Sequence, residues 1–301
     1  MKQLFVPFLF LFLVRRSISI IDGFPANSFD ILSQVSLLTR FPNGYTNVCG
    51  GVLIAPNIVL TAAHCVFKND EFAVTARVIL GDVNLYKQDK TEQEFWSHAM
   101  AINKKFQNGG HDANDDVAIV FLSRPAKVCE SPLGAQIAQL PSTWTMNFEP
   151  TPKVPSKLQL ETSVCYIAGW GKSENSNSSF SETPRQMMVK LTVKRQGKHR
   201  YLLARGAGNS RACMGDSGSP VYCFIDGKRL LVGTVSQIGS FSKINEASSS
   251  ADQITFCRDF EYAIIADWRE SSSRISEILE KYGQLEQLEI GQQLCFGKRE
   301  L

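Results

Sequence analysis

Long hydrophobic runs, metal-binding cysteine pairs and nucleic-acid motifs are all scarce in this sequence of 301 residues. The main apolar run, residues 4–14, is too short to span a bilayer, so we expect no membrane anchor. No CxxC pair occurs and the four histidines are scattered, which argues against zinc. No nucleic-acid partner is predicted either, because the chain has no recognition motif and no series of stacking aromatics.

The first residues have the pattern of a secretory signal. Lys2 precedes the apolar run, and Ser17-Ile18-Ser19 is a small-x-small ending, so we expect residues 1–19 to be removed and the protein to be secreted and extracellular. Removal takes away three basic residues and no acid, which leaves 29 of each sign. Global charge therefore points to no particular partner.

Eight cysteines in an exported chain predict four disulfides. Eight cysteines allow 105 pairings, so the count alone does not give the connectivity.

The pattern along the chain favours β-structure. Short apolar runs such as 35–38, 58–60 and 117–122 alternate with turn residues, and similar runs follow a proline-rich linker at 140–157. Asp226-Gly227 predicts a hairpin. Ile275, Ile278, Leu279 and Tyr282 have helical spacing. Two β halves and a terminal helix fit a double barrel.

Three residues in separate segments have the chemistry of nucleophilic catalysis. A serine hydroxyl needs a base to take its proton, a group that orients the base, and donors for the oxyanion. His64 follows an apolar run in TAAHC, Asp116 begins the run DVAIV, and Ser217 lies in GDSG. Taken singly, each has a structural interpretation as a packed histidine, a cap or a turn. Glycines at 215 and 218 would allow a sharp turn that aims the Gly215 and Ser217 N–H groups at one point.

Together the motifs TAAHC, DDVAIV, CYIAGWG and GDSGSP resemble those of the chymotrypsin/trypsin-like serine proteases over residues 20–284. The resemblance implies an all-β fold of two six-stranded antiparallel β-barrels with a C-terminal α-helix, followed by a tail at 285–301. It implies a serine endopeptidase that forms an acyl-enzyme. His64 is then the general base, Asp116 orients it, and Ser217 attacks the carbonyl, with Asp115 rejected as the orienting residue.

The same resemblance implies a set of cystines and an activation pair. A new N-terminus at Ile20 would pair with Asp216, either directly after signal removal or after a cut at Arg16 and trimming. The implied cystines are Cys49–Cys65, Cys165–Cys223, Cys213–Cys257 and, left by elimination, Cys129–Cys295.

Arg211 is unusual for this family, in which the residue six before the nucleophile lies at the base of the specificity pocket. A guanidinium there would repel Lys or Arg of a substrate, so trypsin-like cleavage is rejected. Arg211 could favour acidic substrate residues, or it could fill the pocket or pair with an acid such as Glu246 and leave a shallow site. Ser236 and Gln237 are the expected pocket walls, and the family usually has an aromatic residue in place of Gln237.

Several further sites carry weaker signals. Asp82, Asn84, Asp89 and Glu92 resemble a calcium loop, although Lys87 and Lys90 favour a plain loop, and no cofactor is required. Asn177-Ser-Ser179 is a glycosylation sequon. Residues 183–215 hold eight basic side chains and no acid, which suits a polyanion or a solvated surface. The expected partners are protein or peptide substrates and protein inhibitors.

Two other functions compete with proteolysis. One is a binding or decoy protein that has the protease fold but a blocked site. The unusual residues of the pocket leave this alternative standing. An esterase with a GxSxG elbow is weaker, because the order His, Asp, Ser and the lack of βαβ alternation differ from that fold.

Overall fold

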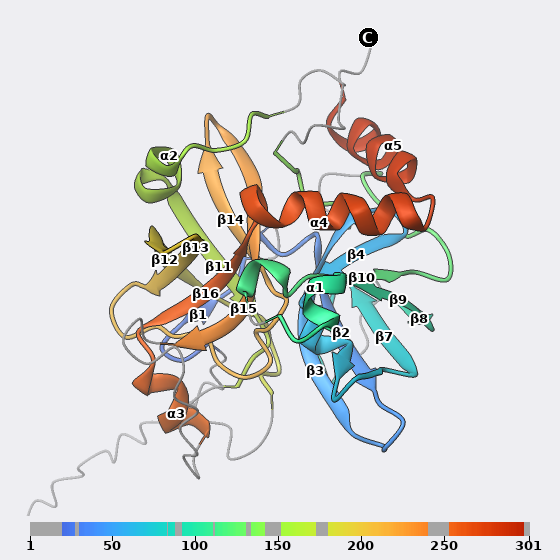
Figure 1. Cartoon of the computed structure of the whole chain (residues 1–301), viewed down its shortest axis with the longest axis horizontal. Coiled ribbons are helices and arrows are strands. Elements are labelled where there is room, and N and C mark those ends of the chain that lie inside the picture. Colours follow the sequence, from blue (N-terminus) through green and yellow to red (C-terminus); the bar gives the residue numbers. More distant parts are fainter. Residues whose placement is uncertain are drawn as a thin grey trace, which may run out of the picture.

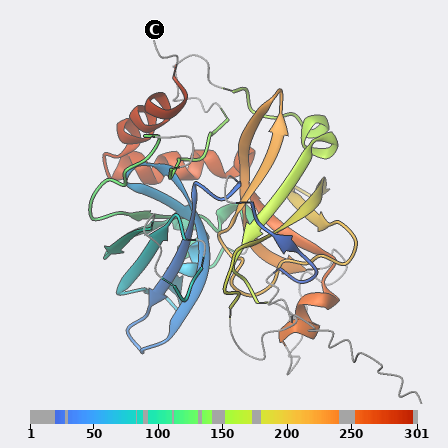
Figure 2. The same cartoon turned by 180° about the vertical axis from the view of Figure 1, so that it is seen from behind.

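The computed structural model describes residues 20–27, 30–82, 84–87, 92–110, 112–130, 134–141, 152–172, 180–239 and 253–297. The expected signal, the sequon at Asn177, Asp89 and Glu246 lie outside these residues. Two β-sheets stand side by side, with helices along their edges (Figures 1 and 2). No helix in the described ranges is both long and apolar enough to cross a membrane.

The first sheet has the strand order β8-β7-β2-β3-β4-β10-β9. Its edge strands β8 and β9 are consecutive in the chain and separated only by His98. The chain itself therefore joins the two edges of this sheet. The strands are β2 (Gln34–Arg40), β3 (Thr46–Ala55), β4 (Ile58–Thr61), β7 (Thr75–Leu80), β8 (Gln93–Ser97), β9 (Ala99–Ile102) and β10 (Ala118–Phe121), with a small separate hairpin of β5 (Phe67–Lys68) and β6 (Glu71–Phe72).

The second sheet has the order β1-β12-β11-β14-β15-β16-β13, and β12 also pairs with β13. Six strands therefore form a closed ring, and β1 lies outside it. The expected hairpin joins β14 to β15, with positive φ at Asp226 and Gly227 as a tight turn requires. The strands are β1 (Phe24–Pro25), β11 (Val164–Gly169), β12 (Arg185–Gln196), β13 (His199–Gly206), β14 (Pro220–Ile225), β15 (Lys228–Gly239) and β16 (Tyr262–Asp267).

The architecture of two β-barrels and a C-terminal helix is confirmed. Each sheet counts seven strands rather than six, because β8 and β9 are two parts of one interrupted run and β1 adds to an edge of the second ring.

Each barrel has its own buried core, and a third cluster draws side chains from both. In this third cluster Tyr166 and Tyr222 pack beside each other, and the Tyr222 hydroxyl lies 2.6 Å from the Ser33 hydroxyl, across the two halves. Burying these rings fixes one barrel against the other.

Short and long helices complete the molecule, and two of them cover the shared core. The expected terminal helix is α4 (Trp268–Lys281), which buries Ile275, Ile278 and Leu279. Helix α5 (Leu285–Phe296) packs on β3, so these residues of the expected tail are a folded element. The others are α1 (Lys104–Gln107), α2 (Lys157–Thr162) and α3 (Gln253–Asp259), with 3-10 turns η2 (Ala63–Cys65) and η3 (Ala113–Asp115).

Four disulfides tie these elements together, and no described cysteine is free. They are the four pairs that the resemblance implies: Cys49–Cys65, Cys129–Cys295, Cys165–Cys223 and Cys213–Cys257. The longest link by sequence, Cys129–Cys295, fastens α5 to the first half of the chain.

Candidate active site

His64 lies in turn η2, directly after strand β4. Its Nδ1 is 2.8 Å from Asp116 Oδ2, and its backbone N–H donates to Asp116 Oδ1 at 3.0 Å. The neighbouring Cys65 is bonded to Cys49 of β3. The ring is thus fixed from two sides, while about a third of the side chain, 35%, stays exposed.

Asp116 follows turn η3 at the start of β10 and is almost completely buried. Besides His64, it accepts a hydrogen bond of 2.6 Å from the Ser236 hydroxyl. Sequence reasoning placed Ser236 only in the pocket wall and missed this contact.

The neighbour Asp115 points elsewhere. Its Oδ1 accepts hydrogen bonds from Arg274 of α4 and from Asn103, which places it away from the imidazole. The ion pair between Asp115 and Arg274 links the turn before Asp116 to helix α4.

The pKa values of His64 and Asp116 move in opposite directions. Burial by itself lowers the pKa of His64, but the charge and hydrogen bond of Asp116 outweigh it and raise that pKa above its ordinary value. Burial raises the pKa of Asp116, but His64 and the Ser236 hydroxyl bring it below its ordinary value. Each group therefore favours the charged form of the other.

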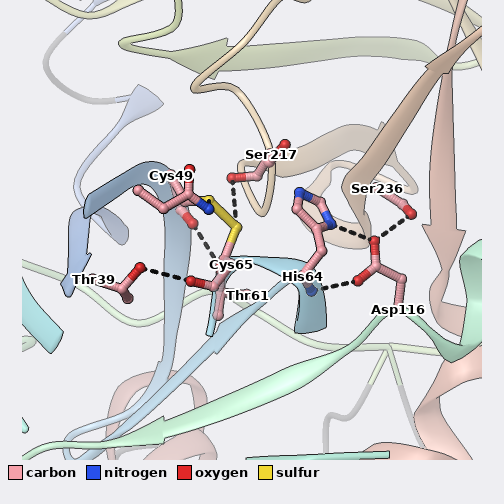
Figure 3. The surroundings of a disulfide bond; sticks show 10 residues. Thr39, Cys49, Thr61, His64, Cys65, Asp116, Ser217 and Ser236 are labelled. Carbon is pink, nitrogen blue, oxygen red and sulfur yellow. Dashed lines mark hydrogen bonds and ion pairs between the residues drawn. A yellow bond between two sulfur atoms is a disulfide. The ribbon is translucent and has the colours of Figure 1, made fainter. Parts of the chain in front are cut away.

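Ser217 lies in the turn between Arg211 and β14. Its carbonyl accepts a hydrogen bond of 2.8 Å from Gly50, which adjoins Cys49, so the first barrel holds the backbone of the second at this point. Figure 3 shows the His64 imidazole between the Asp116 carboxylate and Ser217. The structure has no hydrogen bond between the His64 ring and the Ser217 hydroxyl.

Two glycines give this turn its shape. Gly215 has φ +97° and Gly218 has φ +77°, a region that side chains disfavour. A Cβ on Gly218 would lie 2.2 Å from the Thr61 hydroxyl oxygen. Among the described residues the N–H groups of Gly215 and Ser217 have no intramolecular acceptor, so both are available to a bound oxygen.

A cavity of about 380 Å³ opens beside these residues. It is lined by His64, Asp116 and Ser217 together with the expected walls Ser236 and Gln237, and most of its apolar lining was not predicted from the sequence. The remaining lining residues are Phe106, Gly110, Cys213, Met214, Val235, Ile238 and Phe256.

Arg211 does not line this cavity, contrary to its expected place at the pocket base. Its guanidinium donates to the carbonyl of Ser210 at 2.8 Å and borders a separate recess with Asp22 and Arg258. Ile238 lines both the catalytic cavity and a small void at Arg211, so it lies in the wall between them.

The expected activation pair lies in the interior. Ile20 is completely buried, and Ile21 exchanges two backbone hydrogen bonds of 3.0 Å with Arg211. Asp216 is also buried and accepts N–H groups from Cys213 and Gly171. Burial raises the pKa of Asp216 to about 7, against these two hydrogen bonds. The Ile20 nitrogen is an uncharged amide as long as Ser19 is attached, so it offers no cation.

The described part of the expected calcium loop is engaged in internal contacts. Asp82 accepts the N–H of Asn84, and the Asn84 amide donates to Glu182 at 2.9 Å. The described donor group with metal-like spacing is instead Cys49, His64 and Cys65, and its two cysteines form a disulfide. The expectation of a plain loop rather than a calcium site stays untested.

The basic segment 183–215 forms hairpin β12–β13 and the turn after it. Arg185 is buried, while Arg200 and Arg205 pair with Glu270 and Glu261. Lys190, Lys194, Arg195 and Lys198 are exposed and form no ion pair with a described residue.

Comparisons with known proteins agree with this geometry. The Trypsin family model matches residues 20–252. Chymotrypsin-like elastase family member 1 of Bos taurus is 29% identical over 218 residues, which are 69% of this chain and 74% of that protein. The Homo sapiens protein of the same name is 29% identical over 222 residues, covering 69% and 77%. The solved structure of HL collagenase superposes with a TM-score of 0.63 at 21% identity, covers 88% of this chain and 99% of its own, and supports the fold alone.

Proposed function

Because the chain belongs to the trypsin family and is a serine endopeptidase, we propose that Ser217 forms the acyl-enzyme and that the cavity beside it takes apolar substrate side chains. The observation that carries this proposal is the hydrogen bond of 2.8 Å between His64 Nδ1 and Asp116, in one cavity with Ser217. This hydrogen bond engages Nδ1 and leaves His64 Nε2 to accept a proton.

In this mechanism His64 takes the hydroxyl proton of Ser217 as the oxygen attacks the substrate carbonyl. The imidazolium then gives that proton to the leaving amine, and an ester remains on Ser217. In the second half of the reaction, His64 takes a proton from water as the water oxygen attacks the ester. The ring then returns the proton to the Ser217 oxygen, and the carboxylic acid product is released. Asp116 stabilises the imidazolium, since its charge already raises the pKa of the ring.

The negative oxygen of the tetrahedral intermediate is assigned to the N–H groups of Gly215 and Ser217. Both lack an intramolecular acceptor among the described residues. Donors that are already in place need no reorganisation when the charge develops, which makes this a large contribution to catalysis.

Apolar specificity is inferred from the lining of the cavity. Met214, Val235, Ile238 and Phe256 supply hydrocarbon surface, and the one carboxylate among the described lining residues, Asp116, is held by His64. Arg211 lies behind Ile238 and outside the cavity, so the geometry supports neither acidic specificity nor a pocket filled by the Arg211 side chain. Cleavage after Lys or Arg is not expected, because the described lining offers no free carboxylate to pair with them.

Secretion and activation are proposed to be one event. If removal of residues 1–19 exposes Ile20, its ammonium becomes available to the buried Asp216 carboxyl, which otherwise stays uncompensated. N-terminal sequencing of active secreted protein tests this route, since a start other than Ile20 would exclude it.

The function is tested by two measurements on the secreted protein. A fluorophosphonate should label the enzyme once, and Ser217→Ala should abolish the labelling. A peptide-library cleavage profile should then show apolar residues before the cut. Absence of labelling would favour the decoy interpretation, and a dominance of basic residues before the cut would refute the pocket assignment.

A further inference from the structure

A second open cavity, of about 460 Å³, lies between the first barrel and helix α4. One wall is formed by β9 and α1, and the other by α4, which runs above α1 in the view of Figure 1. We call it the α1–α4 groove. Its volume is within the usual range for ligand sites, and it exceeds that of the catalytic cavity.

The lining of the groove combines apolar and basic side chains. Ile102 and Ile278 contribute apolar surface although both are mostly buried, and Phe72 and Tyr282 are exposed aromatic residues of the lining. Lys104 and Lys281 of the lining are exposed and have no ion-pair partner among the described residues, and the Lys281 ammonium lies 5.3 Å from the centre of the Tyr282 ring.

The other charged groups of the groove do not reverse its positive character. Arg274 is engaged by Asp115, and Glu277 is the acidic residue of the lining. With the Arg274 charge balanced by Asp115, the three remaining charged lining residues, Lys104, Lys281 and Glu277, carry a net charge of +1.

Helix α1 connects the groove to the catalytic cavity. Lys104 and Gln107 line the groove, whereas Phe106 of the same turn lines the cavity that contains His64 and Ser217. The two cavities therefore share α1 as a wall.

We propose that the α1–α4 groove is a docking site for an acidic segment of the protein substrate that carries an apolar side chain. This inference rests on the proposed function, since it assigns a second contact to the same substrate. Carboxylates match the two lysines, and the exposed Phe72 and Tyr282 rings suit an apolar peptide side chain rather than a sulfated sugar. Tethering through the groove raises the local concentration of the scissile bond at Ser217 and lowers KM without changing kcat.

Direct binding tests the groove independently of catalysis. The probe is a fluorescein-labelled hexapeptide with four glutamates around one phenylalanine, titrated by anisotropy against the Ser217→Ala protein, which does not cleave it. The double variant Lys104→Gln/Lys281→Gln should weaken binding by roughly three- to tenfold, as expected for two exposed ion pairs. The matched double variant Lys190→Gln/Lys194→Gln removes the same charge from β12 and should leave the affinity within about twofold.

A kinetic measurement on the active enzyme separates docking from a general charge effect. A fluorogenic peptide extended by the same acidic-aromatic segment should have a lower KM than the unextended peptide. Lys104→Gln/Lys281→Gln should remove that advantage and leave kcat unchanged. Thermal unfolding of each variant checks the fold, and Arg274 is left intact because it holds the turn before Asp116.

The proposal is overturned if both double variants bind the probe as the parent does, or if both lose the same affinity. It is also overturned if replacing the phenylalanine of the probe by glycine changes nothing, because the groove would then recognise charge alone. Fluorophosphonate labelling of the parent enzyme reports the proposed function separately. Labelling without probe binding rejects the groove, and probe binding without labelling rejects the catalytic assignment.

Discussion

At the scale of single residues, the Asp116 carboxylate divides its contacts between His64 and Ser236. Oδ2 accepts hydrogen bonds from the Nδ1–H of His64 and from the Ser236 hydroxyl, and Oδ1 accepts a hydrogen bond from the backbone N–H of His64. The carboxylate is thereby held in one orientation while buried. Ser236 is thus a positioning residue that acts through Asp116.

Replacing Ser236 by alanine should lower kcat/KM by roughly tenfold, since a hydrogen bond to a buried charge is removed. The matched control is Ser219→Ala, because the buried Ser219 hydroxyl has no hydrogen-bond partner among the described residues. Steady-state kinetics on an apolar peptide substrate measures both. Equal losses in the two variants would contradict the role of Ser236.

The position of Arg211 makes an unusual prediction about specificity. Arg211→Gln should leave the residue preference before the cut unchanged, because Ile238 stands between that guanidinium and the cavity. A peptide-library profile of both proteins measures the effect. An altered preference at the position before the cut would show that Arg211 reaches the substrate.

At the scale of elements, the strands with clean apolar runs were predictable and the irregular ones were not. β4, β10 and β14 appear in the sequence as uninterrupted apolar segments. β13 carries His199, Arg200 and Arg205, and its register is fixed by pairing with β12 and β16 rather than by its own pattern. His98 interrupts residues 93–102, so this part of the sequence shows no clear alternation of apolar and polar residues.

Helix α5 was also absent from the sequence analysis, which treated residues 285–301 as a tail. Its apolar residues have no strong helical face, and Ile290 and Leu294 are exposed. What holds it is a buried amide and a disulfide, both of which depend on distant residues. Such long-range contacts cannot be read from local periodicity.

The Gln292 side chain should be a main anchor of α5. Its amide donates to the carbonyls of Ile54 and Ala138 at 2.9 Å and accepts the N–H of Leu140 at 3.1 Å. Gln292→Leu should therefore lower the free energy of unfolding by about 2–4 kcal/mol, because buried backbone groups lose their partners. Urea denaturation measures this, and the exposed neighbour variant Gln293→Leu should change it by about 0.5 kcal/mol or less. A loss of similar size in both would contradict the anchoring role.

The pH dependence of the free energy of unfolding should reveal whether the chain starts at Ile20 or keeps the residues before it. In a chain that keeps Ser17–Ser19, burial raises the pKa of Asp216 from 3.8 to about 7. The folded form then holds a proton that the unfolded form releases, so stability falls as pH rises from about 4 to 7. The full effect is on the order of 4 kcal/mol.

A chain that starts at Ile20 should escape most of this loss, because its ammonium pairs with the ionised carboxylate. Denaturant unfolding of both forms at pH 5 and pH 8 gives the comparison, and Asp216→Asn in the longer form should remove the excess pH dependence. Identical pH profiles for the two forms would contradict the activation pair.

At the scale of the whole molecule, the catalytic residues come from both barrels. His64 and Asp116 lie in turns that adjoin β4 and β10 of the first barrel, whereas Ser217 lies in the turn before β14 of the second barrel, and the positioning residue Ser236 lies in β15. The Gly50–Ser217 hydrogen bond and the shared core around Tyr222 hold the two halves together. The motifs predicted which residues meet, but the lining of the cavity and the displacement of Arg211 depend on how the two halves pack.

The central claim is that Ser217 becomes acylated during turnover, and trapping that ester tests it most directly. The enzyme is mixed with a p-nitrophenyl ester of an apolar acyl group, quenched at low pH, and digested for mass spectrometry. The account predicts a burst of one p-nitrophenol per enzyme and an acyl group on the peptide that contains Ser217, with neither in His64→Ala. A full-rate turnover with no burst and no adduct, or an adduct on another residue, would contradict it.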